Sequence, residues 1–504
     1  MFARRSDGTG VRWLAVLAAT LGLAAACPPG ASAARGGSVG LTVDSSHPGR
    51  EIPAQFLGLG FEYKTLARYS GAGTTPLNPV LVQLIANISP GQGPVLRIGG
   101  DTTDWSWWPI PGMQPPAPIS DAITPQWLSA YRNIQRKLGA RLILGINLQT
   151  DSKPVARTEA HALLGALGSA SVAALELGNE PELYTSFGYS RAPDGSYLAT
   201  QVPGWDFAQF ERGFSGIASA LPAVPLAGPT MGNQGWDSEF GQFLSHEPRV
   251  RIATAHRYPL DICSKPDSPR FPSALNVLSD PVSAGLAQRL SPLVRAAQGH
   301  HVPLRIDEMN LTPCPERAGE LRGSFAPALW STAALFDLAS VGVAGVNIQS
   351  STGGTDDLFS FEHTSTGWRA DVAPEYYGLL LFAQAAPVRS RLVRLINAPR
   401  APLHAWATLT PDGVLRVVAV NAGAGPQRLA VRVPGAVGPG TLERMLGRLH
   451  SGRGVSLAGQ TFGASTGSGV LAGRSHQTQI QPAGQQYAVP MPGYSAALFT
   501  VNLH

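Results

Sequence analysis

The sequence predicts an α/β protein: a (β/α)₈ (TIM) barrel with an additional antiparallel β-sandwich domain. Between residues 56 and 387, eight short apolar runs alternate with amphipathic stretches, which is the order of a barrel of parallel strands. After residue 388 the helical periodicity ends, and short β-type runs separated by Pro, Gly and Asp follow. The 504 residues, of which 44% are hydrophobic and 14% charged, are enough for a large core and more than one domain.

The barrel strands are expected to be buried on both faces, because their apolar residues follow one another without strict alternation. A doubly wound open sheet is the alternative fold, but no G-x-G-x-x-G motif follows the first strand. The eight strands are predicted at Phe56–Phe61, Val95–Ile98, Arg141–Asn147, Val172–Leu177, Pro225–Ala227, Val250–His256, Pro303–Ile306 and Val343–Ile348.

Eight helices are predicted between and after these strands, and several of them open with Pro or Asp, residues that favour the first turn. They are expected at Pro79–Ile88, Pro125–Leu138, Arg157–Leu167, Phe207–Leu221, Ser238–Ser245, Pro281–Ala297, Ala326–Ala339 and Pro374–Ala386.

The β-sandwich is expected to draw on both ends of the chain. A β-type run at Ser38–Val43 stands alone before the barrel, so we expect it to pair with strands from the C-terminal region. The sandwich is then built from residues 34–55 and 388–504, and the catalytic barrel from 56–387. Its other strands are predicted at Leu403–Leu409, Val414–Asn421, Arg428–Val433, Gly440–Leu446, Gln485–Val489 and Ser495–Val501.

Residues 1–33 have the three parts of a secretory signal peptide: arginines within residues 4–12, an apolar run from Trp13 to Ala26, and the small-residue site Ala31-Ser32-Ala33. We therefore expect a secreted, extracellular protein that has no stable membrane partner. Cys27 leaves lipoprotein anchoring open as an alternative.

The charge pattern gives no sign of a nucleic-acid partner. The formal net charge is +5, and 34 of the 38 basic residues are arginines, but no run of four or more basic residues occurs. We expect a glycan or glycoside substrate instead, because of the acidic residues that follow the predicted barrel strands. The sequence leaves the oligomeric state open.

Active residues of a (β/α)₈ barrel lie at the carboxyl ends of its strands. Glu180 follows the fourth predicted strand and Glu308 the seventh, so both are expected in one mouth. Two facing carboxylates suit glycoside hydrolysis, which needs a protonated acid and an ionised nucleophile or base. Metal binding is the rival interpretation, but the nearby Arg97, Asn179 and Arg257 suit hydrogen bonding better than ligation, so we expect neither metal nor cofactor.

Asn179-Glu180-Pro181 together with Glu308 resembles the clan of retaining glycosidases built on (β/α)₈ barrels. A longer set of motifs is similar to glycoside hydrolase family 79, the β-glucuronidase and heparanase family. These motifs are Phe56-Leu57-Gly58-Leu59-Gly60-Phe61-Glu62, Leu96-Arg97-Ile98-Gly99-Gly100, Ala255-His256-Arg257-Tyr258-Pro259, Asp307-Glu308-Met309-Asn310 and Pro374-Glu375-Tyr376-Tyr377-Gly378. The resemblance implies that Glu180 is the acid/base and Glu308 the nucleophile.

The remaining strand-end residues are expected to bind substrate or to support the two glutamates. The resemblance gives Asn179 a hydrogen bond to the sugar and lets Tyr258 orient Glu308. Arg97 is expected to keep Glu308 ionised, because a nearby cation lowers a carboxylate pKa, whereas Asp307 is expected to point away into the barrel wall. Further substrate contacts are predicted for Glu62, Asp101, Asp104, Asn147 and His256.

One segment departs from the family pattern. Family members often hold the uronate carboxylate with a glycine-rich loop after the nucleophile, whereas this chain has Pro313 and Pro315, which lack N–H donors. Recognition of a uronate would then need a charge from Arg257 or Arg317.

Three functions remain open on these grounds. The first is an exo-acting β-glucuronidase that removes terminal β-linked glucuronic acid or its 4-O-methyl ether. The second is a heparanase-like endo-β-glucuronidase or a β-glycosidase for another sugar. The third, from another class, is a non-catalytic carbohydrate-binding surface protein; the presence of both carboxylates counts against it.

The cysteines predict one disulfide. If Cys27 leaves with the signal peptide, Cys263 and Cys314 remain, and a cysteine pair in an exported protein is most simply a disulfide. They follow the sixth and seventh strands, so they lie on neighbouring loops at the catalytic rim. Two separate thiols are the alternative.

Overall fold

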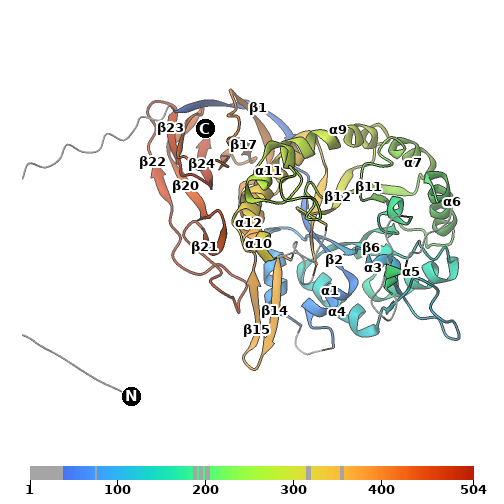
Figure 1. The fold of residues 1–504 in the computed structure, drawn as a ribbon. Helices are drawn as coiled ribbons and strands as arrows, with labels where there is room; N and C mark the ends of the chain where they lie inside the picture. Colours follow the sequence, from blue (N-terminus) through green and yellow to red (C-terminus); the bar gives the residue numbers. More distant parts are fainter. Residues whose placement is uncertain are drawn as a thin grey trace, which may run out of the picture. The chain divides into compact units, whose positions relative to one another are not determined.

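A computed structural model describes residues 38–73, 77–185, 190–191, 197–198, 205–313, 319–351 and 357–503, with the backbone alone for 190–191, 197–198 and 319–320. It confirms the predicted fold class: a closed barrel of eight parallel strands and an antiparallel β-domain (Figure 1). The predicted signal peptide lies outside the described residues. None of the helices in the described ranges has the length and apolar character to span a membrane.

The barrel strands agree with the predicted runs to within a few residues at each end. Almost all of their residues are buried, which explains why the sequence of these strands lacks alternation. In barrel order they are β2 (Leu57–Glu62), β3 (Val95–Gly99), β6 (Arg141–Ile146), β7 (Val172–Leu177), β10 (Leu226–Met231), β11 (Val250–Arg257), β12 (Leu304–Met309) and β13 (Gly345–Ser350).

The predicted helices are present, and side-chain caps fix several of their starts. Asn78, Thr124, Ser152 and Asp206 each accept a hydrogen bond from a backbone N–H of the first turn. The helices are α2 (Pro79–Asn87), α4 (Pro125–Leu138), α5 (Lys153–Leu167), α6 (Phe207–Ala218), α7 (Phe240–His246), α9 (Ala284–Gly299), α11 (Ala326–Val341) and α12 (Glu375–Ala385).

Helix α1 (Tyr63–Ser70) and the hairpin of β14 (Phe359–Thr364) and β15 (Gly367–Val372) are the longest features of the barrel region that were not predicted, and shorter ones such as α3 (Thr102–Trp105) and α8 (Ala274–Val277) were also missed. Helix α1 begins directly after β2 and ends at Gly71, whose left-handed conformation (φ 72°) suits glycine. The β14–β15 hairpin follows β13 and precedes α12 in the chain, and it projects from the lower edge of the molecule in Figure 1. Most residues of both strands are exposed or half-buried, as expected of a two-stranded ribbon.

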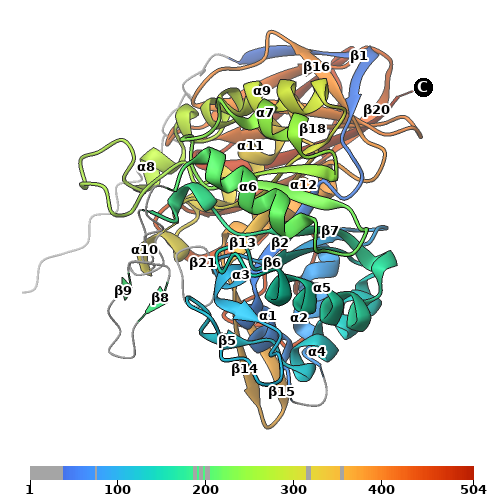
Figure 2. The same ribbon diagram turned by 90° about the vertical axis from the view of Figure 1, so that its right-hand side faces the viewer.

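The β-domain contains the predicted N-terminal strand. β1 (Val39–Glu51) pairs antiparallel with β16 (Arg391–Ile396) and parallel with β19 (Gln427–Arg432), so both chain ends build this domain (Figure 2). The strand order is β21-β20-β24-β18-β17-β16-β1-β19-β23, and β22 pairs with β20. The other strands are β17 (Leu403–Leu409), β18 (Val414–Asn421), β20 (Ala436–Arg448), β21 (Ser451–Leu457), β22 (Thr478–Ile480), β23 (Gln486–Met491) and β24 (Ser495–Leu503).

The β-domain has one core of its own and shares another with the barrel. Leu415, Val417 and Phe499 point into the core between its two layers. The alternate residues Val418 and Leu498, from the same strands β18 and β24, join the large core of the barrel and its helices. Helix α11, which is apolar all round, is buried at this junction.

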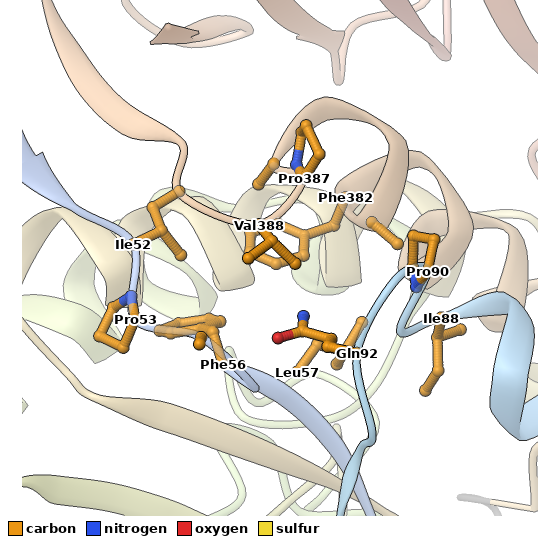
Figure 3. Close-up of a pocket in the computed structure, with 13 residues that line it drawn as sticks. Ile52, Pro53, Phe56, Leu57, Ile88, Pro90, Gln92, Phe382, Pro387 and Val388 are labelled. Carbon is orange, nitrogen blue, oxygen red and sulfur yellow. The ribbon is translucent and has the colours of Figure 1, made fainter. Parts of the chain in front are cut away.

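A small apolar pocket lies at the amino end of β2, the end opposite the carboxyl ends of the barrel strands (Figure 3). Phe56, Phe382 and Pro387 are among the residues that line it, and Gln92 provides its polar side chain. No carboxylate is among the residues that line this pocket, whereas Glu180 and Glu308 lie at the carboxyl ends of β7 and β12.

Candidate active site

The two glutamates singled out in the sequence lie side by side at the carboxyl ends of β7 and β12. One carboxylate oxygen of Glu180 and one of Glu308 lie within 4.8 Å of each other. Glu180 has a left-handed backbone (φ 48°, ψ 55°), rare for a residue with a side chain, and its N–H donates to the Thr230 carbonyl at 3.1 Å. This turn aims the Glu180 side chain at Glu308.

Glu308 is held as an ionised carboxylate. The Tyr258 hydroxyl donates to its Oε1 at 2.8 Å, and the Arg97 guanidinium donates to its Oε2. Burial acts to raise the pKa of Glu308, but His256 and Arg97, with the hydrogen bond from Tyr258, outweigh burial and hold that pKa below its ordinary value. Glu308 therefore has the protonation state of a nucleophile.

Glu180 has the opposite character. Burial, followed by the negative charge of Glu308, raises the pKa of Glu180 to about 8. His256 Nδ1 lies 3.0 Å from Glu180 Oε1, while its Nε2 lies 3.3 Å from a guanidinium nitrogen of Arg97. Since Arg97 can only donate, Nε2 must accept and Nδ1 must donate to Glu180. The second oxygen of Glu180 is left to carry the acidic proton.

His256 acts here as a positioning residue, which corrects its predicted role as a substrate contact. Its side chain has no exposed surface, and both ring nitrogens face protein groups. Burial lowers the pKa of His256 to about 4, so the ring is neutral near pH 7. A neutral ring donates one hydrogen bond to Glu180 without adding a positive charge that would lower the Glu180 pKa.

Arg97 lies under both glutamates and is fully buried, so it cannot touch a sugar directly. Its Nε donates to Glu176 at 2.7 Å, and one of its terminal nitrogens donates to Asn179 Oδ1 at 2.8 Å. Its nitrogens face Glu176, Glu308, Asn179 and His256 inside the barrel, which agrees with the expected support of Glu308 and leaves no nitrogen for a substrate. Its position favours the ionised form of Glu308.

Asp307 also lies inside the barrel, whereas the sequence predicted that its side chain would point away into the barrel wall. It is completely buried, and one of its oxygens lies 3.6 Å from His256 Nε2. Strand β12 shifts register against β11 between Ile306 and Glu308, which brings Asp307 to the inner side. Burial, then the charge of Glu176, raises the pKa of Asp307, which favours its protonated form beside Glu176.

Asp101 is the side chain beside the two glutamates that can reach a sugar hydroxyl, and the buried Asn179 supports it; a direct bond from Asn179 to the sugar stays a prediction. Asn179 Nδ2 donates to Asp101 Oδ1 at 3.0 Å, and Asp101 is half exposed. Burial, then the charges of Glu62, Glu180 and Glu308, raises the pKa of Asp101, which places it in the same field as the catalytic pair. Glu62 mainly anchors this loop, because it accepts from the backbone N–H of Asp101 at 3.1 Å and of Thr102 at 2.8 Å.

Two predicted substrate contacts have structural roles instead. Asp104 is buried and accepts from the backbone N–H groups of residues 148, 149 and 179 and from the Tyr184 hydroxyl. Asn147 is also buried; its amide donates to the Asp104 carbonyl at 2.8 Å and its Oδ1 accepts from Thr150. Both side chains hold the loops after β6 and β7 together, and neither directs a free hydrogen-bonding atom at the mouth.

The sequence had left Arg257 as a candidate to bind the uronate carboxylate, but in the structure its guanidinium is occupied. One of its terminal nitrogens donates to Asp237 Oδ1 at 2.5 Å, and the other to the carbonyls of Met231 and His256. Arg317, the other candidate, lies outside the described residues. So does Cys314, and the predicted Cys263–Cys314 disulfide stays a prediction; Cys263 is exposed after β11.

Two residues near Glu180 were missed in the sequence. A β-carbon on Gly232 would lie less than 3.0 Å from three side-chain atoms of Glu180, so only glycine leaves room for this carboxylate. Glu182 accepts from the Asn233 N–H, and burial, then the charge of Glu180, raises the Glu182 pKa to about 7. No local pattern marks either residue, because the loop after β10 meets the loop after β7 only in the fold.

A cation could be considered between these carboxylates. Glu180, His256 and Glu308 each offer an atom within 4.8 Å of the others, and so do Glu176, His256 and Asp307. Arg97, however, already donates to Glu176 and Glu308 and faces His256 Nε2. The donor set is thus occupied by a built-in positive charge and fits hydrogen bonding better than metal ligation.

No protein-family model matches this sequence, and no curated protein matches it either. Solved structures of similar fold are glycoside hydrolases. A 4-O-α-L-rhamnosyl-β-D-glucuronidase from Fusarium oxysporum has a TM-score of 0.70 at 18% identity, over 92% of this chain and 100% of that one. An arabinofuranosidase of family 51 from Xanthomonas axonopodis pv. citri has a TM-score of 0.63 at 14% identity, over 92% and 100%. A family 30 subfamily 8 xylanase from Clostridium acetobutylicum has 0.54 at 14% identity, over 92% and 100%.

At these identities the likeness is one of fold, shared with (β/α)₈ glycoside hydrolases of several families. Membership of family 79 is not singled out and stays a prediction.

Proposed function

We propose that the protein is a retaining β-glycosidase, with Glu180 as acid/base and Glu308 as nucleophile. The observation that carries the proposal is the short distance between the two carboxylates, whose nearest oxygens lie within 4.8 Å. Retaining enzymes place these groups about 5–5.5 Å apart, whereas inverting enzymes need about 6.5–9.5 Å to admit a water. The opposite pKa shifts of the two glutamates support the same assignment.

The chemistry follows from the geometry. In the first step, Glu308 attacks the anomeric carbon, the bond to the leaving oxygen breaks, and that oxygen takes the proton from Glu180. In the second step, the Glu180 carboxylate removes a proton from water, the water oxygen attacks the anomeric carbon, and the bond to Glu308 breaks. His256 holds Glu180 through both steps, and Tyr258 and Arg97 hold Glu308.

The proposed substrate is a terminal β-linked glucuronide. The motifs shared with family 79 support this choice, and a structure of similar fold is a glucuronidase by name. Arg257 is occupied by Asp237, so the uronate carboxylate would have to be held by other groups. Export to the cell exterior is proposed on the N-terminal sequence alone.

Glutamine variants at the two positions test the mechanism. Glu308→Gln is expected to abolish turnover, because an amide is not a nucleophile. Glu180→Gln is expected to slow substrates with poor leaving groups far more than activated aryl glycosides, which need little protonation. Equal losses on both substrate types would contradict the role of Glu180.

The sugar is tested separately with a panel of aryl β-glycosides: glucuronide, galacturonide, glucoside and xyloside. The glucuronide is expected to give the highest kcat/KM. If NMR shows that the α-anomer of the sugar is released first, retention is refuted. A preference for the glucoside or the xyloside would refute a uronide substrate and leave the mechanism intact.

A further inference from the structure

The β-domain has a charge very different from that of the barrel. Residues 388–504 contain eleven arginines, no lysine and only two acidic residues, Asp412 and Glu443, a formal charge of +9. Residues 52–387 contain 22 basic and 28 acidic residues, a formal charge of −6. The modest net charge of the whole chain conceals this separation, which becomes a property of one surface only once the strands are placed in the fold.

The layer formed by β16, β1, β19 and β23 has one buried and one outward face. Leu41, Val393, Leu429 and Val489 point into the core of the β-domain. The alternate residues point outward, away from that core. This outward face, which we call the basic face, is unlike that of the other layer, whose residues beyond the core pack on the barrel.

Three arginines lie at outward positions of these strands: Arg394 on β16, and Arg428 and Arg432 on β19. All three are exposed, and Arg428 and Arg432 are about 13 Å apart along their strand. Several outward residues between Arg428 and Arg432 and on the neighbouring strands β1 and β23 are small, whereas on β16 the outward neighbours of Arg394 are Leu392, which packs against the barrel core, and the exposed Ile396. The small or short residues are Gly40, Thr42, Ala430 and Ala488.

Few acidic groups compete for these arginines. No acidic residue occurs in β16, β19 or β23, and β1 contributes Asp44 and Glu51. Asp44 is engaged with Ser46 and His47, and Arg394 is among the charges that lower its pKa. Within the described ranges, none of the eleven arginines forms an ion pair.

A groove of about 360 Å³ opens where this layer meets β17. Arg50 and Arg394 line it together with Trp406, a half-buried aromatic side chain. Arg394 thus belongs both to the basic face and to the groove, so one edge of the basic face is lined by two cationic groups and by Trp406.

We propose that the basic face and this groove bind an anionic polysaccharide, independently of the catalytic mouth. Carboxylate or sulfate groups along the chain would pair with Arg394, Arg428 and Arg432, since guanidinium groups bind such oxyanions in a bidentate manner. The choice of a polysaccharide among polyanions rests on the proposed glycosidase function. The surface would hold the enzyme on an acidic polymer while its mouth acts on chain ends.

The test compares two triple variants that remove the same charge. Arg394, Arg428 and Arg432 are changed to Gln in the first; Arg448, Arg453 and Arg474 are changed to Gln in the control. The control arginines are also exposed and lie on β20, on β21 and in the following loop. Affinity for hyaluronan, with dextran as the neutral polymer, is measured at low and physiological salt.

The wild type is expected to bind hyaluronan but not dextran, and more weakly as salt rises. The first variant should bind about tenfold more weakly or worse, and the control within about threefold of wild type. Equal weakening in both variants, or no binding by wild type, would overturn the basic face as a site. Tighter binding of duplex DNA than of hyaluronan would contradict the proposal that the ligand of the basic face is a polysaccharide.

Hydrolysis of a small aryl glycoside separates this proposal from the proposed function. Both triple variants should keep the wild-type kcat/KM on that substrate, because all six arginines lie outside the catalytic residues. An inactive wild type that still binds hyaluronan through the basic face would refute the glycosidase alone.

Discussion

Gly232→Ala tests whether the fold was built around the position of Glu180. The new β-carbon would lie less than 3.0 Å from three side-chain atoms of Glu180, and ordinary contacts are 3.4–4 Å. The Gly232 backbone does not have the positive φ that would strain alanine, so the cost falls on the neighbouring carboxylate. The carboxylate must therefore move by about 1 Å, because Gly232 directly follows Met231, the last paired residue of β10, and its backbone has little freedom to shift.

A displacement of about 1 Å at a reacting group costs about 100-fold in rate. We expect Gly232→Ala to lower kcat/KM by about that factor on an unactivated glycoside, and by much less on an activated aryl glycoside, which needs no acid. The melting temperature should change little. The leaving-group contrast distinguishes a displaced acid from general damage.

Gly165→Ala is the matched control, since Gly165 is exposed on α5 and nothing lies within 4 Å of its added β-carbon. It should keep wild-type kinetics on both substrates. The reasoning would be refuted if Gly232→Ala hydrolysed the unactivated glycoside within threefold of wild type, or if its losses on the two substrates were equal.

Two further predictions concern pH and stability. Because Glu180 must be protonated and its pKa is about 8, kcat/KM should fall as pH rises through 8. Because Glu308 must be ionised and its pKa lies below the ordinary value, the loss of activity in acid should begin below about pH 4.5. A pH–rate profile whose alkaline limb lies near pH 5 would contradict the assignment. Asp104→Ala should lower the free energy of unfolding by about 3–5 kcal/mol, since it strands several buried donors, and urea unfolding that shows less than about 1 kcal/mol would contradict the structural role of Asp104.

The barrel could be predicted because its information is local and repeated. Each strand is a short apolar run, each helix has a periodic apolar face, and parallel strands joined by helices have few arrangements. Helix α1 and the β14–β15 hairpin, both missed, illustrate the limit: α1 starts without a loop after β2, and the hairpin has weak alternation beside a barrel whose signals dominate.

The position of the two glutamates could be predicted from the sequence: Glu180 and Glu308 end two strands of one barrel, and only a shared mouth is compatible with that order. The sequence did not determine which polar neighbours face the mouth. Asp104, Asn147, His256 and Arg97 are drawn inward by hydrogen bonds to residues distant in sequence, and a register shift in β12 brings Asp307 with them. Burial and long-range pairing decide such orientations, and these are properties of the tertiary structure alone.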